Sequence, residues 1–229
     1  MLPNNSGVAR PRTSLYDPNL QTLDDLKQWI RSVLRTYAFE IRGLLLKDGT
    51  VLPLPSESAL IAKLFEVTLL ERFRTVANAV RGLEIHGAPG TRTYPDIWLS
   101  GDRISGQKIA LEVKAARRNP AGTRTSSRIT LGPYDKYFRN PAVKMSGAVI
   151  PYGEFDSHLD IIVLYDYDGG EVLSVEPLVV EKWRVASRKK SSGTRNYIGA
   201  VNEIERLKLE QGEFASAQEF YDFWRSFPL

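Results

Sequence analysis

Two consecutive runs of strand-forming residues in the second half of the chain limit the folds that it can adopt. They read LDIIVLYDYD (159–168) and EVLSVEPLVV (171–180), and both are rich in β-branched residues. Gly169 and Gly170 separate them, and two glycines between such runs are typical of a β-hairpin. The sequence therefore predicts a strand-rich centre.

The N-terminal part of the chain divides at Thr22. Residues 1–21 are rich in Pro, Asn, Ser and Arg and lack periodicity, which predicts a flexible or loosely docked arm. After Thr22, a suitable N-cap, apolar residues recur at helical spacing and predict a helix over 23–36. No internal repeat and no linker interrupts 22–229, so we expect one domain there.

Two further elements follow that first helix. A hairpin is expected in AFEIRGLLLKDGTVLPL, because Asp48-Gly49 is a strong turn signal between apolar runs. A broad apolar stripe from Leu60 to Val76 then predicts a second helix, for which Ser56 or Ser58 is the expected cap.

The end of the chain also indicates a helix. Ser216 and Glu219 have capping-box spacing before FYDFWRSF. Pro133, in RITLGPYDKYFRN, suits the start of a short helix. Helices at both ends of a strand-rich middle predict an α/β fold with a central mixed β-sheet flanked by helices.

Composition limits the chemistry that is available. The 229 residues are 42% hydrophobic, enough to bury a full core, and include no cysteine and only two histidines, His86 and His158. Any metal must therefore be held mainly by oxygen. The net charge of +4 and a pI near 9.2 make a polyanionic partner worth testing. No signal peptide or membrane span is visible, so we expect a cytoplasmic protein without a membrane partner.

A pair of acids marks a candidate metal site. Asp96 in YPDIWL and Glu112 in IALEVK are separated by fifteen residues, a length that fits two adjacent strands joined by a turn. Strand geometry places Glu112 and Lys114 on one face and turns Val113 into the core. Carboxylates can hold Mg²⁺, and the ammonium of Lys114 can orient a water or stabilise developing charge. The alternative is that Glu112 and Lys114 form a solvent-facing pair on an edge strand.

Two basic segments accompany these strands, and neither contains an acid. The first lies within 113–134 and the second within 182–202; their basic residues are Lys114, Arg117, Arg118, Arg124 and Arg128, and Lys182, Arg184, Arg188, Lys189, Lys190 and Arg195. Such runs are usually solvated faces. Beside a site that cleaves phosphodiesters they fit a clamp on a DNA backbone, for which Arg117 and Arg118 are candidates.

YPDIWL with IALEVK resembles the signature of the PD-(D/E)xK nuclease superfamily. Most of the chain, from about Tyr37 to Phe227, is similar to the EcoRV family of type II restriction endonucleases within it. The similar segments occur in the matching order: GLLLKDGTVLPL, KLFEVTLLERF, YPDIWL, ITLGPYDKYFRN, LDIIVLYDYD, SSGTRNYIG and GEFASAQEFYDFWRSF. Several of them carry no catalytic residue, which favours shared ancestry.

The resemblance implies a set of site residues. Asp96, Glu112 and Lys114 would be catalytic, the two acids would hold Mg²⁺, and Val113 would lie at the metal. Glu66, in LFEV, falls where the family has a further helix-borne acid near the metals, although the sequence alone makes it a solvated flank residue. The resemblance implies an aspartate at the position of Glu112, and glutamate there is a variation that the superfamily permits.

The resemblance also implies residues that read DNA. The loop SSGTRN matches the loop that reads bases in the major groove; its residues are Ser191, Ser192, Gly193, Thr194, Arg195 and Asn196. Arginine pairs well with guanine O6 and N7, so we expect Arg195 to contact a guanine. Thr91 and Arg92, in HGAPGTRT, match a minor-groove loop, although a loop of this composition can equally be inert.

Together these expectations describe a type II site-specific deoxyribonuclease. By resemblance, it is a Mg²⁺-dependent homodimer that cuts double-stranded DNA at a palindromic site of six base pairs, bluntly and with 5′-phosphates, beside a cognate methyltransferase in a restriction-modification system. The helix at 23–36 and the Asp48-Gly49 hairpin are the candidate dimer interface, unless their apolar faces are ordinary core. The alternatives are a structure-selective or repair nuclease and a DNA-binding protein with a vestigial site.

Overall fold

A five-stranded mixed sheet forms the centre of the computed structural model, which describes residues 15, 17–90 and 93–229. Its strand order is β3-β4-β5-β7-β8, and only β5 and β7 pair in parallel. The strands are β3 (Glu84–Gly87), β4 (Ile97–Ser100), β5 (Ile109–Arg117), β7 (Ser157–Asp168) and β8 (Glu171–Glu181). The predicted central mixed sheet is therefore confirmed.

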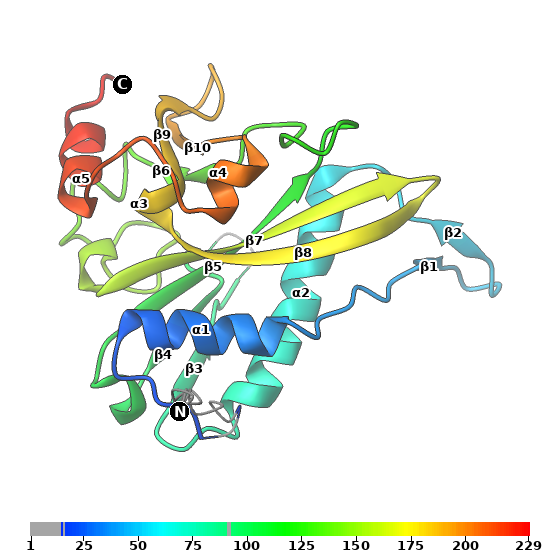
Figure 1. Cartoon of the computed structure of the whole chain (residues 1–229), viewed down its shortest axis with the longest axis horizontal. Helices are drawn as coiled ribbons and strands as arrows, with labels where there is room; N and C mark the ends of the chain where they lie inside the picture. The colour runs from blue at the N-terminus through cyan, green and yellow to red at the C-terminus, as the bar shows by residue number, and fades with distance from the viewer. Residues whose placement is uncertain (1–14, 16, 91–92) are drawn as a thin grey trace, which may run out of the picture.

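The two longest strands form the hairpin that the glycine pair predicted. β7 and β8 pair antiparallel, with Val163 opposite Pro177 near the middle. Gly169 and Gly170 have φ angles of 57° and 88°, a region of backbone conformation that glycine tolerates best. In Figure 1 this hairpin runs across most of the width of the molecule.

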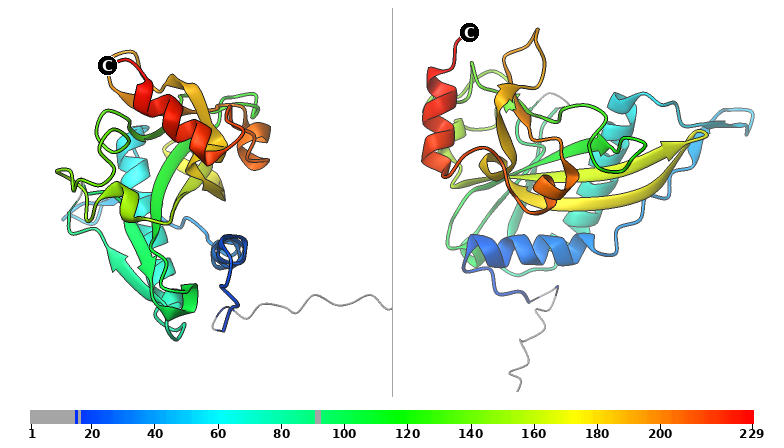
Figure 2. Two further views of the ribbon diagram at one scale, coloured as in Figure 1. Left: turned by 90° about the vertical axis from the view of Figure 1, so that its left-hand side faces the viewer. Right: turned by 45° about the horizontal axis from the view of Figure 1, so that its top comes forward.

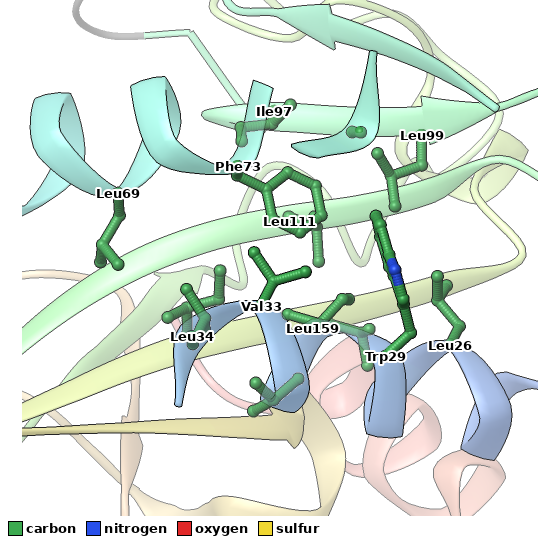
Figure 3. Packing of buried hydrophobic residues seen from close by; sticks show 14 of the residues in the cluster. Leu26, Trp29, Val33, Leu34, Leu69, Phe73, Ile97, Leu99, Leu111 and Leu159 are labelled. Carbon is green, nitrogen blue, oxygen red and sulfur yellow. The ribbon is translucent and has the colours of Figure 1, made fainter. Parts of the chain in front are cut away.

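Helices α1 (Leu23–Leu34) and α2 (Ser58–Ala77) cover one face of the sheet. Figure 3 shows their apolar side chains meeting Ile97, Leu99, Leu111 and Leu159 of the strands. The Trp29 and Phe73 rings pack edge to face between the two helices, with centroids 5.4 Å apart. The apolar stripes predicted for both helices therefore form the core on this face.

The helix caps confirm one prediction and correct another. Thr22 caps α1 in a capping box with Asp25. The cap of α2 is Glu57, whose carboxylate accepts a hydrogen bond from the Ala59 amide. The expectation of Ser56 or Ser58 was wrong, because the helix already includes Ser58 and a glutamate carboxylate reaches the free amide.

A smaller layer covers the other face of the central sheet. It comprises the antiparallel sheet β6-β10-β9 and three helices, and α5 and β9 lie across the central sheet from α1 (Figure 1, Figure 2). These elements are β6 (Thr130–Pro133), β9 (Ala186–Lys190), β10 (Tyr197–Ala200), α3 (Lys182–Val185), α4 (Ile204–Lys208) and α5 (Ala217–Ser226). The 3₁₀ turn η2 (Tyr152–Glu154) packs in the same apolar cluster, whereas η1 (Asp102–Ile104) packs in the cluster beneath α1 and α2.

Two expectations concern this smaller layer. Pro133 ends strand β6 and is followed by turns, so the predicted short helix was wrong. Proline lacks a backbone N–H donor, and this donor is not required either at the end of a strand or in the first turn of a helix. Ser216 does cap α5, as predicted, by accepting a hydrogen bond from the Glu219 amide.

The Asp48-Gly49 turn joins β1 (Gly43–Leu45) to β2 (Val51–Pro53), a hairpin that projects from the body of the molecule (Figure 1). Gly49 has a φ of 87°, in agreement with the turn prediction. Several apolar side chains of the hairpin are exposed; Leu45 is 75% exposed.

The described part of the N-terminal segment packs on the domain. Leu20 is 2% exposed, and the Trp29 indole donates a hydrogen bond to the Leu15 carbonyl oxygen. The Arg103 guanidinium donates to the Pro18 carbonyl oxygen at 2.9 Å. No helix among the described residues has the length and apolar character needed to cross a membrane.

Candidate active site

The register of three neighbouring strands aligns carboxylates on one face of the central sheet. Ile97 of β4 lies opposite Leu111 of β5, and continuing this register by one residue places Asp96 opposite Glu112. On the other side of β5, Glu112 pairs with Asp160 of β7. Because side chains alternate along a strand, these acids share the face that is turned away from α1 and α2.

Asp96 lies at the start of β4, and its carboxylate is held against the backbone of β5. Its Oδ2 accepts a hydrogen bond from the Val113 amide at 2.8 Å. Burial, and next the negative charge of Glu112, raises the pKa of Asp96 from 3.8 to about 7. A cation bound between the two carboxylates would remove this penalty.

Glu112 is held by two ammonium groups, one on each carboxylate oxygen. Lys114 Nζ donates to Oε1 at 2.5 Å, and Lys182 Nζ donates to Oε2 at 2.9 Å. Burial alone would raise the pKa of Glu112, but the two positive charges outweigh it and hold the pKa below its usual range. Glu112 is therefore ionised although it is largely enclosed.

Lys182, which the sequence placed only among the basic residues of a DNA clamp, is instead a buried residue of this site. It begins α3 and is only 3% exposed. Its Nζ also donates to the Leu131 carbonyl oxygen at 2.9 Å and lies 3.6 Å from Oδ1 of the fully buried Asp160. Burial opposes the charge of Lys182, but Asp160 and then Glu112 outweigh it and raise its pKa.

A cavity of about 700 Å³ opens beside these groups. Asp96 and Glu112 lie in its wall together with Arg195, which comes from the loop between β9 and β10. The remaining lining residues are Thr93, Tyr94, Gly132, Pro133, Lys136, Tyr137, Ser146 and Tyr197. The cavity therefore joins the predicted catalytic acids to the predicted reading loop.

Glu66 and Val113 take different places. Glu66 lies on α2, where it forms an ion pair with Lys63, and its charge adds a smaller contribution to the raised pKa of Asp96. Val113 turns its side chain into the core beneath α1 and α2, as strand geometry predicted. Only backbone atoms of Val113 thus face Asp96.

The acid pair fits a hard divalent cation by its chemistry. Its donors are carboxylate oxygens, and Mg²⁺ usually binds to one or two carboxylates with water completing its coordination. In the parts of the chain that the structure describes, no group of three or more His, Cys, Asp or Glu side chains is arranged to hold a metal. Glu66 therefore does not complete a third protein ligand in this conformation.

The loop 191–196 is anchored at its C-terminal end and exposed at its tip. Asn196 Oδ1 accepts hydrogen bonds from the Tyr134 hydroxyl and Lys190 Nζ. Thr194 and Ser192 contact each other through their hydroxyl groups. The exposed residues are Gly193, Thr194 and Arg195. The backbone amide of Ser191 donates a hydrogen bond to the Tyr197 carbonyl oxygen.

The other predicted DNA contacts are not gathered at this cavity. Arg117 lies about 17 Å along β5 from Glu112 at ~3.4 Å per residue, and its guanidinium packs on the Tyr167 ring. Arg118 is paired with Asp166 and Glu176, which favours a structural role. Thr91 and Arg92 lie outside the described residues.

Asp96 should make the metal-free protein less stable as the pH rises. Its folded pKa is raised, so between about pH 4 and pH 7 the folded protein keeps a proton that the unfolded chain has released, and stability falls. We expect Asp96→Asn to add on the order of 2–4 kcal/mol to the free energy of unfolding above pH 7, and almost nothing near pH 4. Urea unfolding with chelator measures both values.

The matched control is Asp168→Asn at the exposed end of β7. It should leave the free energy of unfolding nearly unchanged across the same pH range. An Asp96→Asn gain that does not depend on pH would contradict the assignment of the raised pKa to this carboxyl.

Comparison with known proteins adds independent evidence. The family model for restriction endonuclease EcoRV matches residues 27–229. Among curated proteins, the comparison finds no match. The matched region spans the central sheet, the sheet β6-β10-β9, the hairpin β1–β2, the acid pair and the loop 191–196. The chain therefore belongs to the EcoRV restriction endonuclease family, and it is a hydrolase that cleaves DNA.

Proposed function

We propose that this protein is a site-specific type II restriction endonuclease that hydrolyses duplex DNA with Mg²⁺ at a palindromic six-base-pair site. It cuts both strands bluntly and leaves 5′-phosphates. The observation that carries the proposal is the cavity in which Asp96 and Glu112 share a wall with Arg195. Two acids that can hold a metal thereby face the same cavity as Arg195, which can read a base.

Three side chains carry the chemistry. Asp96 and Glu112 are the residues that would hold Mg²⁺, which when bound neutralises charge on a phosphate and activates water. Lys114, whose ammonium is beside Glu112 Oε1, orients the attacking water and stabilises the charge that develops on the phosphorus-bound oxygens. The water oxygen forms the new bond to phosphorus and gives up a proton, the bond from phosphorus to the 3′-oxygen breaks, and that oxygen takes up a proton to leave as the 3′-hydroxyl. Glu66 contributes to the negative potential at Asp96.

Recognition falls to the loop 191–196. Its exposed tip carries Arg195, and the exposed Lys136 lines the same cavity and can meet a phosphate. Asn196 is engaged in holding the loop to Tyr134 and Lys190, so its role in reading is positional. Arg195 is thus the residue that we assign to a guanine.

A homodimer supplies one active site to each strand of a palindrome. The apolar face of α1 is buried within the chain, where Trp29 and Ile30 are at most 1% exposed. The hairpin β1–β2 instead exposes Leu45, Val51 and Leu52. We therefore assign the interface to the hairpin. The proposed setting is the cytoplasm, with a cognate methyltransferase that protects the host's own sites.

Plasmid DNA incubated with the protein should yield discrete fragments with Mg²⁺ and none with chelator. Asp96→Ala or Lys114→Ala should lower the cleavage rate by roughly 100- to 10,000-fold, because each removes a group that acts on the reacting atoms. Gel analysis of time courses gives the rates, and sequencing of the fragment ends gives the site and the cut position.

Matched controls are Asp168→Ala and Lys208→Ala, which change exposed residues of the same types away from the cavity. Both should cleave like the wild type. Nicking restricted to branched DNA would favour a structure-selective nuclease, and binding without any cleavage would favour a vestigial site. Full cleavage by Asp96→Ala would show that the catalytic assignment is wrong.

Arg195→Ala should relax base preference at one symmetric position of the site. The loss of a bidentate contact to guanine costs about 1–3 kcal/mol of discrimination. Selection of bound duplexes from a random pool measures this preference, with Arg81→Ala, an exposed arginine in the turn after α2, as the control. Equal weakening for all sequences would identify a phosphate contact instead.

Leu45→Asp should convert the dimer to monomer, because it places a charge in the apolar surface of the hairpin. Sedimentation velocity measures the change in mass. Leu209→Asp is the control, since Leu209 is also exposed, at 61%, but follows α4. A wild-type protein that sediments as a monomer both alone and on DNA would refute the dimer.

A further inference from the structure

An ion pair lies behind Glu112, outside the lining of the cavity. It consists of Lys182 at the start of α3 and Asp160 in the middle of β7, and their side chains are 3% and 0% exposed. Neither residue lines the cavity that holds Asp96 and Glu112. Both therefore act on the site indirectly, and Lys182 does so through its contacts with Glu112 and Tyr94.

The two lysines that hold Glu112 are unequally restrained. Lys114 is 17% exposed, and Glu112 Oε1 is its hydrogen-bond partner. Lys182 is surrounded by three oxygen atoms, since it donates to Glu112 Oε2 and Leu131 O at 2.9 Å and lies 3.6 Å from Asp160 Oδ1. Lys114 has partial access to solvent, whereas moving Lys182 would strip a buried ammonium of its partners.

Asp160 is placed by strand pairing to neutralise Lys182. It is directly opposite Glu112 in the β5–β7 register, and two carboxylates in such positions repel each other. Both Asp160 oxygens are buried without a hydrogen-bond partner among the described residues, which leaves the ammonium of Lys182 as the compensating charge. The Tyr94 ring, with its centroid 4.8 Å from Lys182 Nζ, encloses that ammonium further.

We propose that Lys182 is a positioning residue, which anchors Oε2 of Glu112 so that Oε1 is the oxygen presented to the metal. Asp160 balances the charge of Lys182, so the charge of Glu112 remains available to the metal. Without Asp160, the Lys182 ammonium would be balanced by Glu112 alone. This inference rests on the proposed function, since it assigns Glu112 to a divalent cation.

The absence of cysteine allows a direct test of the ammonium. Lys182→Cys provides a single thiol, which is alkylated in the unfolded chain before refolding. 2-Bromoethylamine rebuilds a side chain of lysine length that ends in an ammonium, and 2-bromoethanol builds one of equal length that ends in a hydroxyl. Wild-type protein and Lys208→Cys, at an exposed position on α4, undergo the same treatment as controls.

We expect the hydroxyl form to lose about 10- to 100-fold in turnover, the usual cost of losing a group that orients a metal ligand. Its affinity for duplex DNA without metal should stay within about threefold, and circular dichroism should match the wild type. The ammonium form should recover turnover. If Lys182 served only folding, the hydroxyl form would instead be less stable, and its turnover and DNA affinity would fall together.

A second measurement does not depend on cleavage. Mn²⁺ binding to the DNA-free protein is followed by electron paramagnetic resonance for wild type and Asp160→Asn. We expect Asp160→Asn to weaken Mn²⁺ binding about tenfold, because the uncompensated ammonium of Lys182 repels the cation. Asp168→Asn, at an exposed position of the same strand, should bind Mn²⁺ like the wild type.

Wild-type turnover by a folded hydroxyl form would overturn the proposal, and so would wild-type Mn²⁺ affinity in Asp160→Asn. If the hydroxyl form does not refold, the comparison of Mn²⁺ affinity between wild type and Asp160→Asn tests the proposal by itself. If wild-type protein fails to cleave DNA with Mg²⁺, the proposed function is wrong, while the Mn²⁺ comparison still tests the role of Asp160 and Lys182.

Discussion

The alternation of side chains along β5 is the constraint on which the rest of the structure depends. Leu111 and Val113 point into the core beneath α1 and α2, while Glu112 lines the cavity on the other face and Lys114 pairs with it there. A register shift of one residue would exchange these faces and bury the ionic pair among leucines and aromatic rings. The apolar core therefore holds the face that carries Glu112 and Lys114 in place.

The same register concentrates charge at a cost to the fold. Asp96, Glu112 and Asp160 lie on adjacent strands, and two lysines compensate them only in part. Asp96 has a raised pKa because it is buried beside another carboxylate. Perturbed groups of this kind are common where a protein binds ligands or catalyses reactions. A bound cation is the natural compensation for this arrangement, since it can interact with both cavity-facing acids.

Sequence patterns predicted the features that depend on neighbouring residues. The capping box at Thr22, the hairpin turn at Gly169-Gly170 and the strand alternation around Val113 were each correct, since a few adjacent residues decide them. The cap at Glu57 and the strand at Pro133 were missed, because several local residues suited those positions equally well. Asp160, near the start of the apolar run LDIIVLYDYD, was the signal in the sequence for a buried ionic partner, and the prediction of the site did not include it.

The sequence by itself predicted the central sheet and the two covering helices, because periodicity encodes them, and a short signature made Asp96, Glu112 and Lys114 the candidate site residues. Only the tertiary structure decided what surrounds them. Lys182 is seventy residues from Glu112 in the chain, and it reaches the site because β8 returns beside β7 and α3 turns inward. Contacts between distant segments depend on strand order and layer packing, and no local pattern in one sequence specifies these.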